Sequence, residues 1–376
     1  MNSRKILFLI LVVILLAFSS CNKAKQEFEN NNVSELPIES YPSPVISETQ
    51  SEGYPSPKPE PPMNNGYPAP VVTDSPSLEE LEPLDLISEF SVDEPARMKW
   101  CANQECFSLI GYETFKVLSY PDFEELFSYK IQENEYLLDI SPDGKTYAIT
   151  DNNADITLRN WEFDSEQVIH TNTFFMSAEF SPDGKNIMLT NMDEWGAPIF
   201  DIESGDQITT LTGFETAAPV YDVRYGQNSE YAVWISRATI QVSEISTNQL
   251  FPAIYHQDFI ISFDLNESGD WLATSAAETT NDQFMPAVFV HDFVTGEIIH
   301  KFNTDQSVYS LQFSPDSSKL ALATGSVITL VDMKSFQATN RFIGNDETIS
   351  QLLFSPDGTI LVSIGEGLKI NFWDIK

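Results

Sequence analysis

The chain has 376 residues and a formal net charge of −36, with 56 acidic and 20 basic side chains. A surface of this sign repels phosphate backbones and anionic lipid head groups, which argues against nucleic acid as a partner and against charge-driven membrane binding. The length is sufficient for a large hydrophobic core.

The first residues have the pattern of a signal peptide. Arg4 and Lys5 precede an uninterrupted apolar run from Ile6 to Phe18, and two serines then lead to Cys21. Thirteen apolar residues are typical of a signal-peptide core and too few for a membrane span. The arrangement resembles the lipobox of bacterial lipoproteins, which implies cleavage after residues 1–20, lipid attachment at Cys21 and an extracytoplasmic protein anchored to the cell membrane. An ordinary secretory signal cleaved nearby is the alternative.

Residues 21–77 form a linker of biased composition. Eleven of the 22 prolines lie here, and a Tyr-Pro-Ser/Ala-Pro motif begins at Tyr41, Tyr54 and Tyr67. Proline lacks an N–H and large aliphatic side chains are scarce, so the segment cannot build a packed core. We expect a disordered stalk that samples polyproline II, although such repeats also serve as ligands for aromatic grooves.

From residue 78 to residue 376 the sequence repeats with a period in the forties. A turn such as Ser181-Pro-Asp-Gly184, flanked by alternating apolar residues, begins each of seven units. Proline presets the second turn position, and the glycine can take the left-handed conformation that closes the turn. The seven units begin at Ser91, Ser141, Ser181, Gly226, Asn266, Ser314 and Ser355. A period of this size with strand-like content predicts an all-β, seven-bladed β-propeller.

A second mark follows each turn by about twenty residues, where an apolar or aromatic residue stands near an acidic one. It occurs at Trp161, Phe200, Ser243, His291, Val331 and Trp373. This mark resembles the third strand of WD40 repeats, and Gly213-Phe214 and Gly344-Asn345 stand where that family carries a Gly-His pair. The Ser-Pro-Asp-Gly turns also resemble propellers of the TolB type. The WD40 resemblance implies a rigid ring that serves protein contacts.

The last unit stops after its third strand, which would leave an exposed sheet edge. We therefore expect Ser77–Leu84 to supply the outer strand of that blade and so close the ring.

Two cysteines remain after Cys21. Cys101 and Cys106 flank a four-residue turn, which we place between the second and third strands of the first blade. Residues opposed across a hairpin come close enough for a disulfide, and an extracytoplasmic compartment permits one. The alternative is two free thiols.

Motifs of enzymes are absent from the sequence. It has no Gly-x-Ser-x-Gly elbow, no His-Glu-x-x-His, no Cys-x-x-Cys and no phosphate-binding glycine loop. His291 occupies the tryptophan-like position before Asp292, which favours a structural role. We therefore predict a protein that is not an enzyme and that needs no metal or cofactor.

A partner is expected to bind loops at one end of the ring, because packing consumes the blades themselves. Enlarged loops carry Trp195, Phe214, Phe284 and Met285, and these are the candidate partner-binding residues. An aromatic side chain in a loop can instead be tucked under its own turn. The sequence favours a monomeric, non-catalytic scaffold with a protein partner on the rim. The alternative function is binding of a small molecule, sugar or ion in the central cavity, as a sensor or carrier.

Overall fold

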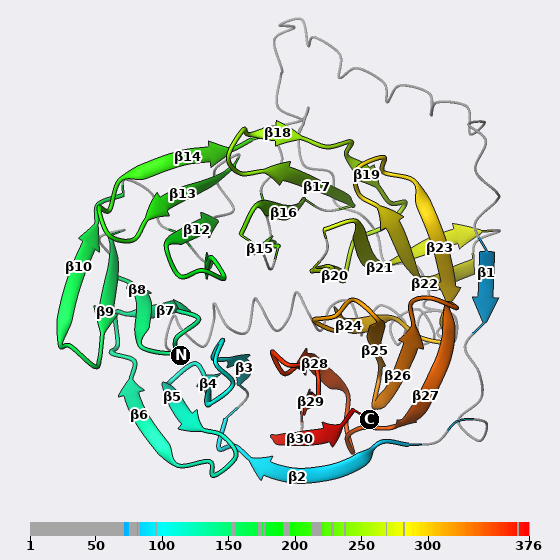
Figure 1. Cartoon of the computed structure of the whole chain (residues 1–376), viewed down its shortest axis with the longest axis horizontal. Helices are drawn as coiled ribbons and strands as arrows, with labels where there is room; N and C mark the ends of the chain where they lie inside the picture. The colour runs from blue at the N-terminus through cyan, green and yellow to red at the C-terminus, as the bar shows by residue number, and fades with distance from the viewer. Residues whose placement is uncertain are drawn as a thin grey trace, which may run out of the picture. The chain divides into compact units, whose positions relative to one another are not determined.

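Seven β-sheets surround a common axis in the computed structural model of the protein (Figure 1). The structure describes residues 71–74, 81, 83–94, 96–151, 155–171, 175, 177–190, 196–212, 220, 222–226, 229–236, 238–267, 269–280, 283–366 and 368–375. These lie in the compact unit Gly66–Lys376, which is described here by itself. The prediction of an all-β, seven-bladed propeller is confirmed.

In each blade the strands run outward from the axis in chain order, except that segments from the N-terminal side of the body add the outermost strand of blade 7 and a fifth strand to blade 5. Blades 1 and 2 contain β3 (Arg97–Trp100), β4 (Cys106–Ile110), β5 (Thr114–Ser119), β6 (Glu125–Lys130), β7 (Tyr136–Ile140), β8 (Thr146–Thr150), β9 (Ile156–Asn160) and β10 (Ser165–Ile169). Blades 3 and 4 contain β11 (Ser177–Phe180), β12 (Asn186–Thr190), β13 (Ala197–Asp201), β14 (Gln207–Leu211), β15 (Asp222–Tyr225), β16 (Tyr231–Ser236), β17 (Thr239–Glu244), β18 (Gln249–Leu250) and β19 (Ile254–Tyr255).

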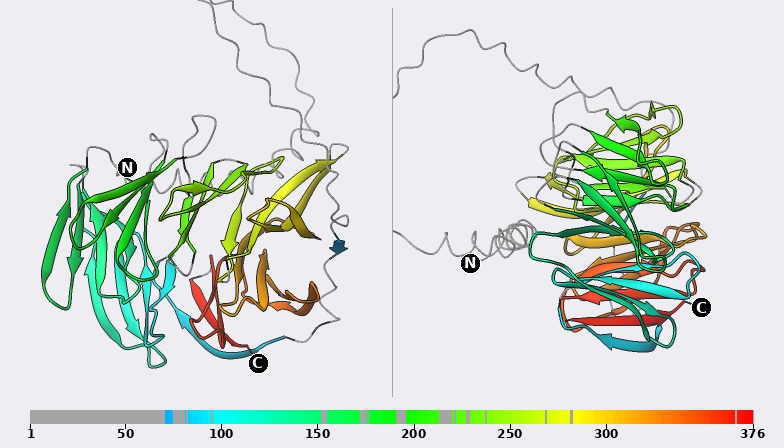
Figure 2. Two further views of the ribbon diagram at one scale, coloured as in Figure 1. Left: turned by 45° about the horizontal axis from the view of Figure 1, so that its top comes forward. Right: turned by 90° about the vertical axis from the view of Figure 1, so that its left-hand side faces the viewer.

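Blades 5 and 6 contain β20 (Ser262–Leu265), β21 (Trp271–Thr280), β22 (Gln283–Asp292), β23 (Ile298–Asn303), β24 (Val308–Phe313), β25 (Lys319–Thr324), β26 (Val327–Asp332) and β27 (Gln337–Ile343). Blade 7 contains β28 (Ile349–Phe354), β29 (Ile360–Gly365), β30 (Lys369–Asp374) and β2 (Asp85–Ser91). The tilted views show the blades arranged side by side around the ring (Figure 2).

The repeated turn joins the first and second strands of every blade. Its fourth residue donates a backbone hydrogen bond to the first and has a positive φ, as the Ser-Pro-Asp-Gly pattern predicts. These fourth residues are Gln104, Gly144, Gly184, Ser229, Gly269, Ser317 and Gly358, with φ between 58° and 73°. The first turn therefore begins at Cys101. The prediction that the first unit begins at Ser91 is wrong, because Ser91 ends a strand of blade 7.

The ring closes through β2, which pairs antiparallel with β30 at the other end of the chain (Figure 1). Phe90 stacks on Phe123 of blade 1 at 5.6 Å between ring centroids, so β2 also contributes to the core between blades 7 and 1. An N-terminal strand thus completes the last blade, as expected, but the strand is Asp85–Ser91 and not Ser77–Leu84. Within that predicted range, Leu84 instead packs against the core between blades 6 and 7.

One short strand lies within the range assigned to the linker by composition. β1 (Val71–Asp74) pairs in parallel with β23, with Val71 opposite His300 and Asp74 opposite Asn303. Three of its four residues are β-branched, and such residues favour a β-strand. The proline-rich sequence before them has no such preference. The chain thus contacts the outer edges of blades 5 and 7 before it enters blade 1.

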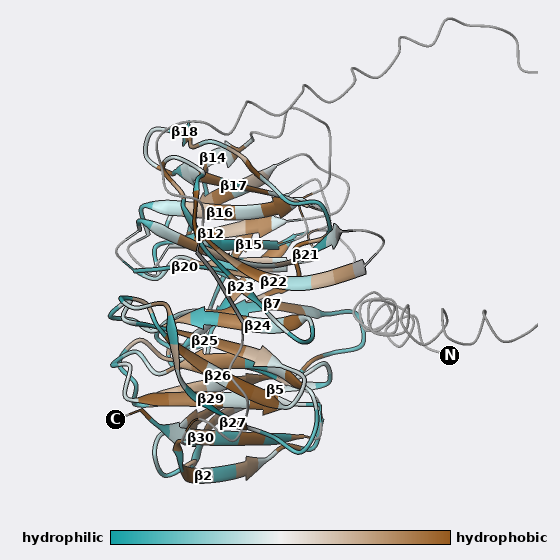
Figure 3. Ribbon diagram, turned by 90° about the vertical axis from the view of Figure 1, so that its right-hand side faces the viewer, coloured by the Kyte–Doolittle hydropathy of each residue, from teal (hydrophilic) through white to brown (hydrophobic). Residues whose placement is uncertain are grey.

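The hydrophobic core consists of layers between neighbouring blades. Middle strands such as β26 and β29 are drawn largely brown in Figure 3, because most of their buried residues are apolar. Phe107 and Phe372, for example, are fully buried and lie 6.0 Å apart between blades 1 and 7. The described part of the chain contains no helix that is long and apolar enough to cross a bilayer.

Candidate functional site

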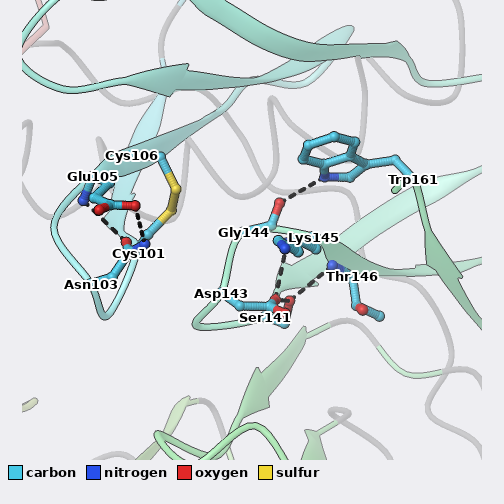
Figure 4. Close-up of a disulfide and its surroundings, with 10 residues drawn as sticks. All are labelled: Cys101, Asn103, Glu105, Cys106, Ser141, Asp143, Gly144, Lys145, Thr146 and Trp161. Carbon is cyan, nitrogen blue, oxygen red and sulfur yellow. Dashed lines mark hydrogen bonds between the residues drawn. A yellow bond between two sulfur atoms is a disulfide. The ribbon is translucent and has the colours of Figure 1, made fainter. Parts of the chain in front are cut away.

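The two cysteines lie in the first repeated turn, where the structure joins them as a disulfide (Figure 4). The turn connects the first and second strands of blade 1, so the prediction that it connects the second and third is wrong. Cys101 stands where Ser141 stands in blade 2, and Asn103 accepts a hydrogen bond from the Glu105 N–H, as Asp143 does from the Lys145 N–H.

The disulfide replaces a side-chain hydrogen bond that five of the other six turns make. In blade 2 the Ser141 hydroxyl accepts the Thr146 N–H at 2.9 Å, and the cysteine pair bridges the same two positions in blade 1. Both sulfur atoms face Gly144 of blade 2, because a Cβ there would meet Cys101 Sγ at 2.8 Å and Cys106 Sγ at 3.2 Å. The bridge is therefore part of the contact between blade 1 and blade 2.

This equivalence predicts how cysteine variants rank in stability. Removing a bridge across six residues should cost about 2 kcal/mol, so Cys101→Ala with Cys106→Ala should lose about that much. Cys101→Ser with Cys106→Thr should lose about half as much, because the serine hydroxyl can accept the residue-106 amide as Ser141 does. Urea unfolding of both variants and the oxidised protein measures the ranking. Equal loss in both variants would contradict it.

Polar side chains of the innermost strands hold the blades together near the axis. Each of the seven blade-to-blade junctions has such a contact, most of them from a side chain to a backbone amide of the next blade. In ring order these contacts are Lys99 Nζ to Asp139 Oδ2 (2.7 Å), Phe180 N–H to Asp139 Oδ2 (2.8 Å), Tyr225 N–H to Glu179 Oε2 (3.2 Å), Arg224 Nη1 to Phe263 O (2.7 Å), Phe313 N–H to Asp264 Oδ2 (2.8 Å), Phe354 N–H to Gln312 Oε1 (2.6 Å) and Met98 N–H to Gln351 Oε1 (2.9 Å). The polar residues that a binding cavity would use thus have structural partners.

The charged groups near the axis are electrostatically coupled. Burial raises the pKa of Glu179 to about 8 and that of Asp264 to about 6. Burial opposes the charge on Arg224, but neighbouring carboxylates raise its pKa overall. Asp222 and Arg224 lie 3.7 Å apart and keep 43% and 38% of their side chains exposed. This pair is therefore one part of the axis, among the described residues, that a ligand could reach.

His291 of blade 5, which is buried, and His256 of the link before that blade, which is half-buried, share one network. The Thr274 hydroxyl lies 3.0 Å from His256 Nε2 and 3.3 Å from His291 Nε2. Burial lowers the pKa of His256 to about 4 and that of His291 to about 3, so both rings are neutral near pH 7. The structure gives His291 the structural surroundings expected from its position in the strand.

His256 is a residue that the sequence reasoning missed. It precedes the turn at Asn266 by ten residues, the spacing at which Asn345 precedes Ser355, and this spacing could have identified it. The prediction that Trp161 holds the same third-strand position in blade 2 as Phe200 holds in blade 3 is also wrong. In the strand pairing Asn160 is opposite Thr146, as Asp201 is opposite Asn186, so Asn160 matches Asp201 and Trp161 comes after the strand. Trp161 lies in the following turn and donates from Nε1 to the Gly144 carbonyl at 2.8 Å (Figure 4).

The candidate partner-binding residues Phe284 and Met285 lie in an extended hairpin. The sequence predicts an enlarged loop here, but the additional residues lengthen β21 and β22 to ten residues each, so the ribbon projects beyond its neighbours (Figure 3). Phe284 is 50% exposed and Met285 is 41% exposed. Trp195, Phe214 and Cys21 lie outside the described residues.

On both edges of the extended hairpin, a hydrogen bond to another segment of the chain hinders pairing with a further strand. The Thr279 N–H donates to Gln257 Oε1 at 3.2 Å on one edge, and the Pro286 carbonyl accepts the Thr304 N–H at 3.1 Å on the other. Proline also has no N–H to offer to a further strand. Side chains at the tip, and not its backbone edges, are therefore the groups that the hairpin offers to a partner.

A family model described as "WD domain, G-beta repeat" matches residues 336–374. The matched segment runs from the outer strand of blade 6 to the third strand of blade 7, where Trp373 Nε1 donates to Ser363 Oγ at 2.9 Å. No group of three or more His, Cys, Asp or Glu residues suited to a metal occurs among the described residues. WD40 propellers are commonly protein-interaction scaffolds and are generally non-catalytic. The repeat match and the seven blades together show that the chain carries a WD40-like β-propeller.

Proposed function

We propose that this protein is a membrane-anchored, extracytoplasmic lipoprotein whose propeller is a non-catalytic scaffold for a protein partner. The observation that carries the proposal is the half-exposed pair Phe284 and Met285 at the tip of the projecting hairpin. Large apolar side chains held in the solvent at a loop end are typical of contact surfaces. The polar side chains near the axis, by contrast, mostly form hydrogen bonds or ion pairs with the neighbouring blade.

The anchor is proposed from the basic start, the apolar run and Cys21. Cells that express the full chain and are fed a labelled fatty acid should incorporate the label into the protein. Cys21→Ser should abolish the incorporation, because the thiol is the acceptor, and should release the protein from the membrane fraction. Retained label in the variant would contradict lipidation at this position, while release of both forms would indicate an ordinary secretory signal.

The scaffold role predicts a contact that depends on the hairpin tip. The native protein is crosslinked in its own membrane, and the adducts are identified by mass spectrometry. A double variant, Phe284→Ser with Met285→Ser, should lose the adducts by about tenfold or more, because two apolar anchors are removed. Its melting temperature should stay within a few degrees of the wild type, since both side chains are exposed.

A matched control distinguishes a contact that depends on the hairpin tip from one that any exposed apolar side chain could make. Phe163 is 74% exposed and lies in the turn between β9 and β10, at the opposite end of the blades. Phe163→Ser should leave the adducts unchanged. Equal loss in both variants would show that the crosslinks are not specific to the rim, and a large fall in melting temperature for the double variant would make its residues part of the core.

A second candidate function is small-molecule, sugar or ion binding at the axis. The exposed part of the Asp222–Arg224 pair favours it, because the pair offers both signs of charge where protein surrounds them. Thermal-shift screening with sugars and divalent ions, repeated with Arg224→Met, tests this function. A ligand that stabilises the wild type and not the variant would support it.

A further inference from the structure

We infer that the hairpin tip recognises a protein with a positively charged face, in which Lys and Arg surround an apolar pocket. This inference rests on the proposed scaffold function and adds the chemistry of the partner. It is carried by three observations: the length of the hairpin, the apolar residues at its tip and the sign of the charge around it.

The hairpin stands above the neighbouring blade. β21 and β22 have ten residues each, whereas the matching strands of blade 6, β25 and β26, have six. The repeated turns set the same register at the other end, so the four additional residues of each strand project at the loop end. At about 3.4 Å per residue they add about 14 Å. A protrusion of this height can enter a recess on another protein.

The two sides of the protrusion carry one apolar anchor each. Phe284 is opposite Thr279 and Met285 is opposite Glu278 in the ladder, so their side chains point to opposite faces. Lys301 of β23, the fourth strand of this sheet, pairs with Glu278 and lies 5.3 Å from the Phe289 ring centre, so contacts to the neighbouring strand support the hairpin. A backbone held in a paired hairpin loses less entropy on binding than a free loop does.

The charge around the tip is negative. In the link 255–258 and in the hairpin segment 278–286, the sequence has three acidic residues, Asp258, Glu278 and Asp282, and no Lys or Arg, while Lys301 of β23 pairs with Glu278. At least nine of the described Lys and Arg side chains already pair with carboxylates. The remaining surface charge is therefore mainly acidic, in keeping with the net charge of −36. A cationic face complements this surface, and a second copy of the chain would be repelled.

The inference is tested with a photo-crosslinking amino acid, p-benzoylphenylalanine, in the full-length chain in its own membrane. The probe replaces Phe284 in one protein, Phe163 at the other end in a second, and Tyr112 in a third. Tyr112 is 44% exposed and lies in the β4–β5 turn of blade 1, at the same end of the blades as the hairpin. Adducts are identified by mass spectrometry, including the crosslinked peptide of the partner.

Adducts are expected from position 284, at partner peptides rich in Lys and Arg, and not from position 163. Their yield should fall about tenfold between about 0.1 M and 1 M NaCl, where the Debye length shortens from about 10 Å to about 3 Å. Asp258→Lys, a charge reversal in the link beside the hairpin, should lower the yield. Asp122→Lys, an exposed residue in the β5–β6 turn, should not.

Each other result overturns the inference in a recognisable way. A salt-independent adduct, or one at an acidic partner surface, would reject the cationic partner and leave the scaffold function standing. Adducts from position 112 alone would move the contact to another blade, with the scaffold function again retained. A second copy of this chain as the adduct would replace the partner with self-association. No adduct from any of the rim positions would reject both the inference and the scaffold function.

Discussion

Replacing Asp85–Ser91 with a Gly-Ser segment of equal length should lower the melting temperature of the propeller by at least about 10 °C. The change removes the ladder between β2 and β30 and exposes the edge of β30. It also removes Phe90 from the core between blades 7 and 1. Because β2 joins the N-terminal side of the body to its C-terminal blade, the ring can open at this junction without it. We expect a loss of about 5 kcal/mol or more, which is much of the net stability of a typical domain.

Differential scanning calorimetry of the two proteins measures this effect. The same replacement at Val71–Asp74 is the matched control, because β1 is a fifth strand outside a complete four-stranded blade. The control should shift the melting temperature by only a few degrees. A synthetic peptide of residues 83–94, added to the first variant, should restore part of the loss by occupying the free edge. An unchanged melting temperature in the β2 variant would show that the ring closes by other contacts.

The two histidines of this network should make the propeller sensitive to acid. His256 and His291 have pKa values lowered by burial from 6.5 to about 4 and about 3. The unfolded chain therefore binds protons below about pH 6.5 that the folded protein excludes. Their contribution to stability is fully present above pH 6.5 and is lost as the pH falls toward 4. Each histidine should contribute a slope of about 1.4 kcal/mol per pH unit over this range.

Two axial carboxyl groups act in the opposite direction. The pKa of Glu179 is raised from 4.5 to about 8, and that of Asp264 from 3.8 to about 6. The folded protein keeps these protons where the unfolded chain releases them, so this contribution is present at low pH and is lost as the pH rises through these values. A titration of the wild type alone therefore mixes two effects, and a histidine variant is needed to separate them.

His256→Gln should reduce the acid slope of the unfolding free energy by about 1.4 kcal/mol per pH unit, because glutamine does not titrate and can still bond to Thr274. Urea unfolding at a series of pH values between about 7 and 4.5 measures the slope. His170→Gln is the control for the substitution itself, since the His170 side chain is 82% exposed and lies outside the Thr274 network. Identical slopes for His256→Gln and the wild type would contradict a neutral His256.

The candidate site was only partly predictable from the sequence. Phe284 and Met285 were identified because the spacing of blade 5 contains additional residues, but whether these residues form a loop or longer strands depends on pairing between β21 and β22. The axial contacts were not predictable, since Asp139 and the Phe180 amide that it accepts come from different blades. The His256 network was missed because its histidine lacks the preceding glycine.

The sequence by itself determined the number of blades, the repeated turn and the all-β class, because turn chemistry and period-2 alternation are local properties of the chain. It also placed Cys101 and Cys106 at a turn close enough for a bridge. Only the tertiary structure decided which strand closes the ring, which strands the cysteines join and which polar groups face the axis. These features depend on register between segments far apart in the chain, and a shift of a few residues between them leaves the local pattern unchanged.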